Sequence, residues 1–235
     1  MRKCFVTFLV LASTFAVSQD DNGAMAVVGK VSSLGPGADL AVAISPKTSV
    51  RLGANVFRYG RSFDRDGVTY HGNLNLLSIN ALWDFFPTAG RLHVSGGALL
   101  YNGNKLDANS NVPGGQSFSL GNQTYTSSLA DPVHGSGNVT TRKIAPMVLV
   151  GFGNPAHGES RLAMSFDAGV AFQGTPNVRL NFAGTACDAS GTICRNAATD
   201  PDVQASVLQE QQKLNNDIGM FRFYPIVQFS IGYRF

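Results

Sequence analysis

The last fifteen residues, FRFYPIVQFSIGYRF over 221–235, constrain the fold more than any other part of the chain. Successive side chains of a β-strand point to opposite faces, so residues two apart share a face. One face is apolar or aromatic throughout and comprises Phe221, Phe223, Pro225, Val227, Phe229, Ile231, Tyr233 and Phe235. The other face is largely polar and includes arginines near both ends. This pattern predicts a long strand with a lipid-facing side and aromatic residues at both membrane interfaces.

The end of this strand resembles the closing strand of bacterial outer-membrane β-barrels. The residues that carry the resemblance are the terminal Phe235 and, at alternate positions before it, Tyr233, Ile231 and Phe229. In that family this terminal pattern is the signal that the barrel-assembly machinery reads during insertion. The resemblance to the eight-stranded, OmpA-like type covers 27–235. It implies an all-β, antiparallel up-and-down transmembrane barrel with short periplasmic turns and long extracellular loops.

The composition agrees with a β structure that is rich in glycine and aromatic residues. The 235-residue chain has 26 Gly and 16 Phe, and only 14% of its residues are charged, which is low for a soluble domain. Hydropathy averaged over such a chain is uninformative, because the polar face and the lipid face of each strand cancel.

The first 18 residues have the three parts of a secretory signal peptide. A positively charged start and an apolar run over 5–17 precede a cleavage site after Ser18, and a second possible site follows Ala26. No later segment has the roughly 20 continuous apolar residues that a membrane-spanning helix needs. We therefore expect a cleaved signal peptide over 1–18, a short periplasmic segment over 19–26 and an outer-membrane barrel domain over 27–235.

The net charge excludes one class of function. Removing Arg2 and Lys3 from the 18 basic residues leaves 16 against 15 acidic ones, so the formal charge falls from +3 to +1. The basic balance of the whole chain is thus mostly targeting sequence, and we expect no nucleic-acid partner.

Alternating apolar residues between Gly- and Pro-containing turns predict eight strands, an even number. They cover 27–33, 39–45, 49–59, 73–86, 91–102, 143–153, 161–173 and 221–235. The phase of the sixth strand stays open, because 147–150 is apolar at every position. The connections 60–72, 103–142 and 174–220 are long and polar, and we expect them to be exposed extracellular loops. Within the last one, 177–183 either extends the seventh strand or forms a separate strand.

The aromatic residues support this orientation by gathering near the two predicted rims. Near the short turns lie Trp83, Phe85, Phe152, Tyr233 and Phe235, and near the long loops lie Phe57, Tyr59, Tyr101, Phe172, Phe221 and Phe223. Two such girdles are typical of membrane barrels.

The loop over 174–220 has two further features. Cys187 and Cys194 are close in sequence in an exported segment, which favours a disulfide over a metal or redox pair. Asp200 then precedes Pro201 as the N-cap of a predicted helix that ends near Asp217. We expect its narrow apolar stripe to pack on the loop or on the barrel rim; a partner-binding helix is the alternative.

Charged residues on the inward faces of the strands are the candidate functional residues. They are Lys30, Asp39, Arg51, Asp84, Arg91, His93, Arg161, Asp167, Arg222 and Arg234. Eight strands leave an interior that side chains can fill, and buried charges must be paired. We therefore expect a salt-bridge network that seals the lumen, and the function to be structural or interactive through the extracellular loops. The alternative is a narrow channel for small solutes or ions.

A lipid-modifying enzyme is the third hypothesis. His93 and Ser95 share a strand face, but no acid on that face would orient the histidine, and the pair is predicted to face the lumen. We expect no enzymatic activity, no cofactor and no metal site. The expected partners are outer-membrane lipid and lipopolysaccharide and, during insertion, the assembly machinery, and we expect a monomer. The pattern does not identify an extracellular ligand.

Overall fold

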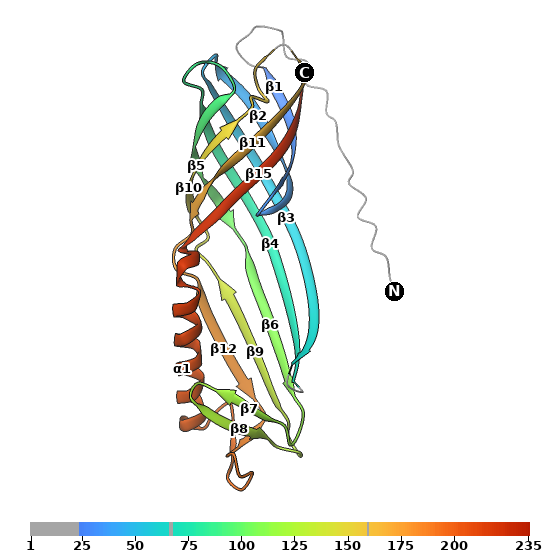
Figure 1. The fold of residues 1–235 in the computed structure, drawn as a ribbon, viewed down its shortest axis with the longest axis vertical. Coiled ribbons are helices and arrows are strands. Elements are labelled where there is room, and N and C mark those ends of the chain that lie inside the picture. The colour runs from blue at the N-terminus through green and yellow to red at the C-terminus, as the bar shows by residue number, and fades with distance from the viewer. Residues whose placement is uncertain (1–23, 66–67, 159) are drawn as a thin grey trace, which may run out of the picture.

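The computed structural model describes residues 24–65, 68–158 and 160–235. Eight antiparallel strands form a closed barrel (Figure 1). They are β1 (Met25–Ser32), β2 (Gly35–Ser45), β3 (Thr48–Arg65), β4 (Val68–Phe85), β5 (Leu92–Asn102), β10 (Ala145–Phe152), β11 (Leu162–Phe172) and β15 (Phe223–Arg234). Each pairs with its neighbour in this order, and β1 closes the ring against β15, with Val31 opposite Phe229. The predicted eight-stranded antiparallel barrel is confirmed.

The alternation of buried and exposed residues along these strands is the physical basis of the barrel. In β10 it is complete, so that Met147 and Leu149 are buried inside while Val148 and Val150 face outward. The sequence left this phase open because all four residues are apolar. Pairing decides it, since Leu149 lies opposite Ser95 of β5 and shares its inward direction.

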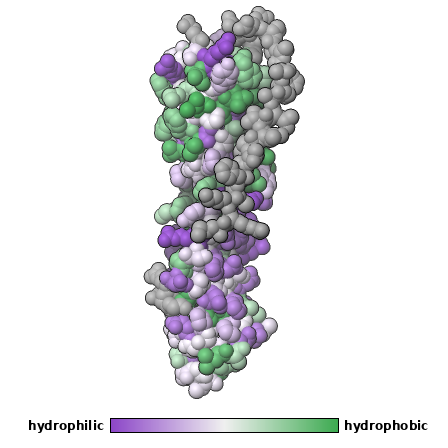
Figure 2. Space-filling model, turned by 90° about the vertical axis from the view of Figure 1, so that its right-hand side faces the viewer, coloured by the Kyte–Doolittle hydropathy of each residue, from purple (hydrophilic) through white to green (hydrophobic). Residues whose placement is uncertain are grey.

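The outer surface of the barrel is apolar and has aromatic residues at both ends. All eleven girdle residues predicted from the sequence are exposed, from Phe57 and Tyr101 at 39% to Phe235 at 64%. Figure 2 shows apolar residues gathered over the barrel end of the molecule and polar residues over most of the other end. This distribution is the one that a barrel surrounded by lipid requires.

The three long connections fold into strands and a helix, which corrects the prediction that they are loops, while many of their residues are exposed. β3 and β4 run past the barrel to Arg65 and Val68, so 60–65 and 68–72 are strand extensions. Beside β4, the extension is continued by β6 (Lys105–Val112), β9 (Val133–Thr140) and β12 (Asn177–Ala183). The segment 177–183 is therefore a separate strand, but it lies outside the barrel and leaves the even count intact.

A second, smaller sheet and a helix complete this part. The sheet contains β7 (Ser117–Leu120), β8 (Gln123–Ser127), β13 (Thr185–Cys187) and β14 (Cys194–Asn196). The helix α1 (Pro201–Asp217) is capped by Asp200, as predicted, and a 3₁₀ turn, η1 (Gly219–Arg222), leads into β15. We call residues 58–75, 103–142 and 174–220 the head. An apolar core that includes Val112, Val133 and Val203 holds the head together.

The helix protects an open sheet edge. β12 is the last strand of the extension, so its outer backbone groups have no partner strand within the described ranges. The side chain of Asn215 accepts a hydrogen bond from Val178 N at 2.9 Å, and that of Gln211 accepts one from Leu180 N at 3.1 Å. The sequence favoured packing of α1 on the loop's own residues or on the barrel rim, and the structure has the first of these. Covering the edge in this way prevents pairing with another chain.

Candidate functional site

A charged cluster occupies the barrel interior and is centred on Arg51 of β3. Its guanidinium binds Asp84 of β4 through two contacts, Nε–Oδ2 at 2.7 Å and Nη2–Oδ1 at 2.9 Å. It also reaches Asp167 of β11, with Nη2–Oδ1 at 3.0 Å and Nη1–Oδ2 at 3.2 Å. β3 and β11 are on opposite sides of the eight-stranded ring, so this one side chain crosses the lumen. Arg51, Asp84 and Asp167 are buried.

Further polar side chains complete the hydrogen bonding of the two carboxylates. Asp167 also contacts His93 Nε2 at 2.8 Å and accepts from Gln228 at 3.3 Å. Asp84 accepts from Ser95 Oγ at 2.6 Å and from Ser49 Oγ at 3.1 Å. Buried charges that are paired and fully hydrogen-bonded avoid most of the desolvation cost that isolated charges would carry.

A second ion pair lies beside this cluster. Lys30 Nζ of β1 is 2.5 Å from Asp39 Oδ1 of β2, and it donates to Asn80 Oδ1 of β4 at 2.9 Å. Space for Asp39 comes from Gly53, because a Cβ at that position would stand 1.6 Å from Asp39 Oδ1. Asn55 extends the network by donating to Asn80 at 3.3 Å. Polar contacts therefore join four neighbouring strands on one side of the lumen.

Two apolar clusters lie in the interior beside the charged groups. Towards the head, Leu34, Leu82, Leu99, Leu149 and Ile226 pack together with Ala145, Met147 and Ala171. At the short-turn end, Phe86 is fully buried with its ring 5.0 Å from that of His93. Ala156, in the turn between β10 and β11, packs against inward residues of β1 and β2. Polar and apolar side chains interleave along the inward faces, since Leu82 lies between Asn80 and Asp84 on β4.

Of the ten residues predicted for the network, the structure brings six together. They are Lys30, Asp39, Arg51, Asp84, His93 and Asp167, and all six are buried. The prediction is wrong for Arg91, Arg161 and Arg222, which are exposed. Each of these three lies just outside a strand, where the alternation of faces no longer sets the direction of a side chain. Arg234 is partly buried and donates to the backbone oxygens of Gly158 and Pro155.

The network includes residues that the sequence analysis did not select. Asn55, Asn80, Ser49 and Gln228 are buried and bonded to its charged groups or to one another. All four lie on the inward faces of predicted strands, so the strand phase could have identified them. We selected only charged residues, and neutral polar partners were missed for that reason.

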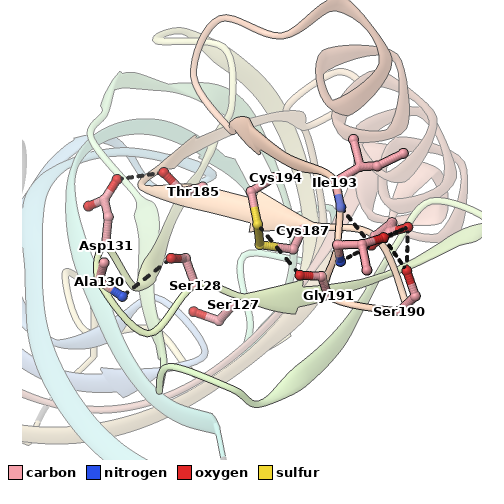
Figure 3. The surroundings of a disulfide bond; sticks show 12 residues. Ser127, Ser128, Ala130, Asp131, Thr185, Cys187, Ser190, Gly191, Ile193 and Cys194 are labelled. Carbon is pink, nitrogen blue, oxygen red and sulfur yellow. Dashed lines mark hydrogen bonds between the residues drawn. A yellow bond between two sulfur atoms is a disulfide. The ribbon is translucent and has the colours of Figure 1, made fainter.

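The predicted disulfide lies in the head and joins β13 to β14. Cys187 and Cys194 face each other across this pair, with Cα atoms 3.9 Å apart (Figure 3). The loop between them is organised by the Asp188 carboxylate, which accepts from Ser190 Oγ at 2.7 Å and from Thr192 N at 2.8 Å. These hydrogen bonds lower the pKa of Asp188, with the largest effect from Ser190. The head is thus cross-linked at its small sheet.

The described residues contain no helix that is long and apolar enough to cross a membrane. In the same residues, no group of three or more His, Cys, Asp or Glu side chains is arranged to hold a metal ion. The predicted signal peptide over 1–18 lies outside the described residues.

The closed barrel with a folded head can be compared with known proteins. No protein-family model matches the chain, and no curated protein matches it. A crystal structure of Acinetobacter baumannii CarO matches at a TM-score of 0.57 and 23% identity, over 89% of this chain and 97% of that one. It shares this fold. CarO2 of the same organism gives a TM-score of 0.58 and 20% identity, over 90% of this chain and 98% of the other. At these identities the likeness to CarO and CarO2 concerns the fold alone.

The geometry of His93 and Ser95 does not form a catalytic dyad. An acid does orient His93, but it is Asp167 from β11 and not a residue of the same strand. Ser95 Oγ donates to Asp84, so its proton is not directed at the histidine. Nucleophilic catalysis requires the nucleophile and the base to be hydrogen-bonded to each other. Both side chains are buried, and they contribute to the interior network instead.

Proposed function

We propose that this chain is an outer-membrane barrel protein, of the small eight-stranded OmpA-like type, whose lumen is closed to solutes and whose head acts at the cell surface. The observation that carries the proposal is the contact of Arg51 with both Asp84 and Asp167 across the barrel. An open pore would leave such charges in contact with water, whereas these side chains are at most 2% exposed. The two apolar clusters beside these charges add to the barrier against ions.

The orientation follows from the unequal ends of the barrel. Short turns join the strands at the end where both termini of the barrel lie, and the head projects from the other end (Figure 1). Outer-membrane barrels have short periplasmic turns and longer extracellular segments, so the head faces outward. Signal-peptide cleavage after Ser18 suits this fold better than cleavage after Ala26, because Met25 and Ala26 are paired with β2.

The partners follow from the outer surface. The apolar belt contacts outer-membrane lipid and lipopolysaccharide, and the protein functions as a monomer because the ring of strands has no open edge. The exposed residues Phe229, Ile231, Tyr233 and Phe235 form the signal for the assembly machinery. These four residues alternate along β15, the strand that closes the ring. The assembly machinery would bind them there when it completes the barrel.

The test is single-channel conductance of the mature protein in planar bilayers, after a heat-shift gel has verified folding. We expect no discrete current steps. The positive control is the triple variant Arg51→Ala, Leu99→Ala, Leu149→Ala, which removes side chains from the charged network and from the apolar cluster beside it. This variant should conduct ions if these groups are the barrier. Reproducible steps from the wild-type protein that change with Asp167→Asn would overturn the closed lumen.

A second measurement tests the orientation of the head. Leu129 is 83% exposed in the head, and Thr88 is exposed in a short turn at the other end. On intact cells, a membrane-impermeant maleimide should label Leu129→Cys and spare Thr88→Cys. Labelling of Thr88→Cys alone would show that the head faces the periplasm.

A further inference from the structure

A cavity of about 680 Å³ lies at the short-turn end of the barrel wall. Its polar lining includes Arg91, Asn154, His157 and Arg234. Its apolar lining includes Phe152, Leu162, Met164, Phe166 and Phe229, and each of these five is 47–64% exposed on the outer surface. The cavity therefore combines positive charge with a wall that is continuous with the lipid-facing belt.

Among the described residues, no acidic side chain balances the positive charge of this cavity. Arg234 donates to the carbonyl oxygens of Gly158 and Pro155, which are neutral, and its buried Nε has no hydrogen-bond partner. Among the described residues, neither Arg91 nor Arg234 belongs to an ion pair, and no acidic side chain lines the cavity. Glu159 lies outside the described residues.

The position of the cavity along the membrane normal restricts the class of ligand that can reach it. Phe152 belongs to the short-turn aromatic girdle, and Arg234 stands between two further members of it, Tyr233 and Phe235. This girdle marks a membrane interface. Phosphate groups of lipids are found at that level. A guanidinium donates two parallel hydrogen bonds to a phosphate and is well suited to this recognition. Acyl chains of the same molecule would contact the exposed apolar lining.

We propose that this cavity binds an anionic glycerophospholipid of the leaflet on the short-turn side, with Arg91 and Arg234 donating to its phosphate. An anionic headgroup is favoured over a zwitterionic one, because the amine of the latter would lie near two arginines that have no carboxylate partner in the described part of the chain. The inference depends on the proposed function, since it requires the barrel to be in a membrane.

The experiment is native mass spectrometry of the mature protein, folded in a non-ionic detergent and titrated with phosphatidylglycerol. We expect one tightly bound lipid, and binding about tenfold weaker for Arg91→Gln and for Arg234→Gln, the loss expected for one charge-assisted hydrogen bond. Arg234→Lys should retain more affinity than Arg234→Gln, and it also serves if the Gln variant fails to fold. Arg161→Gln is the matched control, because Arg161 is exposed at the same end but does not line the cavity.

Three results would overturn the inference. The first is equal binding of phosphatidylcholine, and the second is an equal loss for Arg161→Gln, which would indicate general charge attraction. The third is complete displacement by millimolar inorganic phosphate, which would mean that the apolar wall contributes nothing. The proposed function has its own tests, and it would be contradicted by current steps from the wild-type protein or by labelling of Thr88→Cys alone. In both sets of experiments the heat-shift gel verifies that the barrel is folded.

Discussion

Arg51 and Asp167 belong to opposite walls of the barrel, and their side chains meet in its centre with Nη2 and Oδ1 3.0 Å apart. The same guanidinium is held by Asp84 of the adjacent strand, so one cation links three strands. This single side chain therefore connects opposite walls of the barrel across its interior. It also makes the interior sensitive to the loss of one partner.

Asp167→Ala is predicted to destabilise the folded barrel by about 3–5 kcal/mol, because it leaves Arg51 with one partner fewer in a buried site. The measurement is the unfolding free energy in lipid vesicles from urea titrations. The control is Asp107→Ala, which removes a 3.0 Å ion pair with Lys105 that is largely exposed in the head. Exposed pairs contribute at most about 1 kcal/mol, so equal effects of the two substitutions would contradict a structural role for the cluster.

Gly53→Ala is predicted to disrupt the Lys30–Asp39 pair. The added Cβ would stand 1.6 Å from Asp39 Oδ1 and 2.6 Å from the backbone oxygen of Ala38, so the carboxylate must move. Overpacking of this kind costs about 1–3 kcal/mol, and loss of the ion pair adds to it. Gly96→Ala is the matched control on the outer face, where an added Cβ meets nothing within 4 Å. Its unfolding free energy should stay within about 0.5 kcal/mol of wild type.

The double variant Gln211→Ala, Asn215→Ala is predicted to expose the edge of β12 without unfolding the barrel. It removes the acceptors of the Val178 and Leu180 amides, which are hydrogen-bonded in the native head. Hydrogen exchange should accelerate at these two amides, and the variant should associate more readily at high concentration because its strand edge is open. Gln212→Ala, an exposed neighbour on α1, should change neither quantity. Unchanged exchange in the double variant would mean that the helix does not protect this edge.

His157 is predicted to make stability depend on pH. It lies in the turn between β10 and β11, where burial lowers its pKa below the ordinary 6.5, and the positive charge of Arg234 lowers it further. The unfolded chain then binds the proton more readily than the folded one, so this contribution is complete above pH 6.5 and is lost as the pH falls through the lowered value. The measurement is an NMR titration of the His157 ring, with unfolding free energies at pH 8 and pH 5. His157→Gln should reduce the difference between the two pH values, and an unchanged difference would contradict the assignment.

The sequence by itself determined the elements whose signal is local. The alternation in β15 and β11, the turns between short-connected strands and the cap of α1 by Asp200 follow from residues near one another in the chain. The Cys187–Cys194 pair is equally local. Eight strands of this kind bury their polar face only by closing on themselves, which is why the barrel was predictable.

Only the tertiary structure decided which inward charges meet and that the long connections fold. Arg51 and Asp167 are 116 residues apart, and their contact depends on the number of strands and on the register around the ring. β6 and β9 are rich in Asn, Ser or Gly and alternate weakly, so they become strands only because the extended edge of β4 offers backbone partners. β12 alternates more clearly, but its place beside β9 depends on the same extension. Hydrogen bonds between distant segments stabilise these elements, and no local pattern records such bonds.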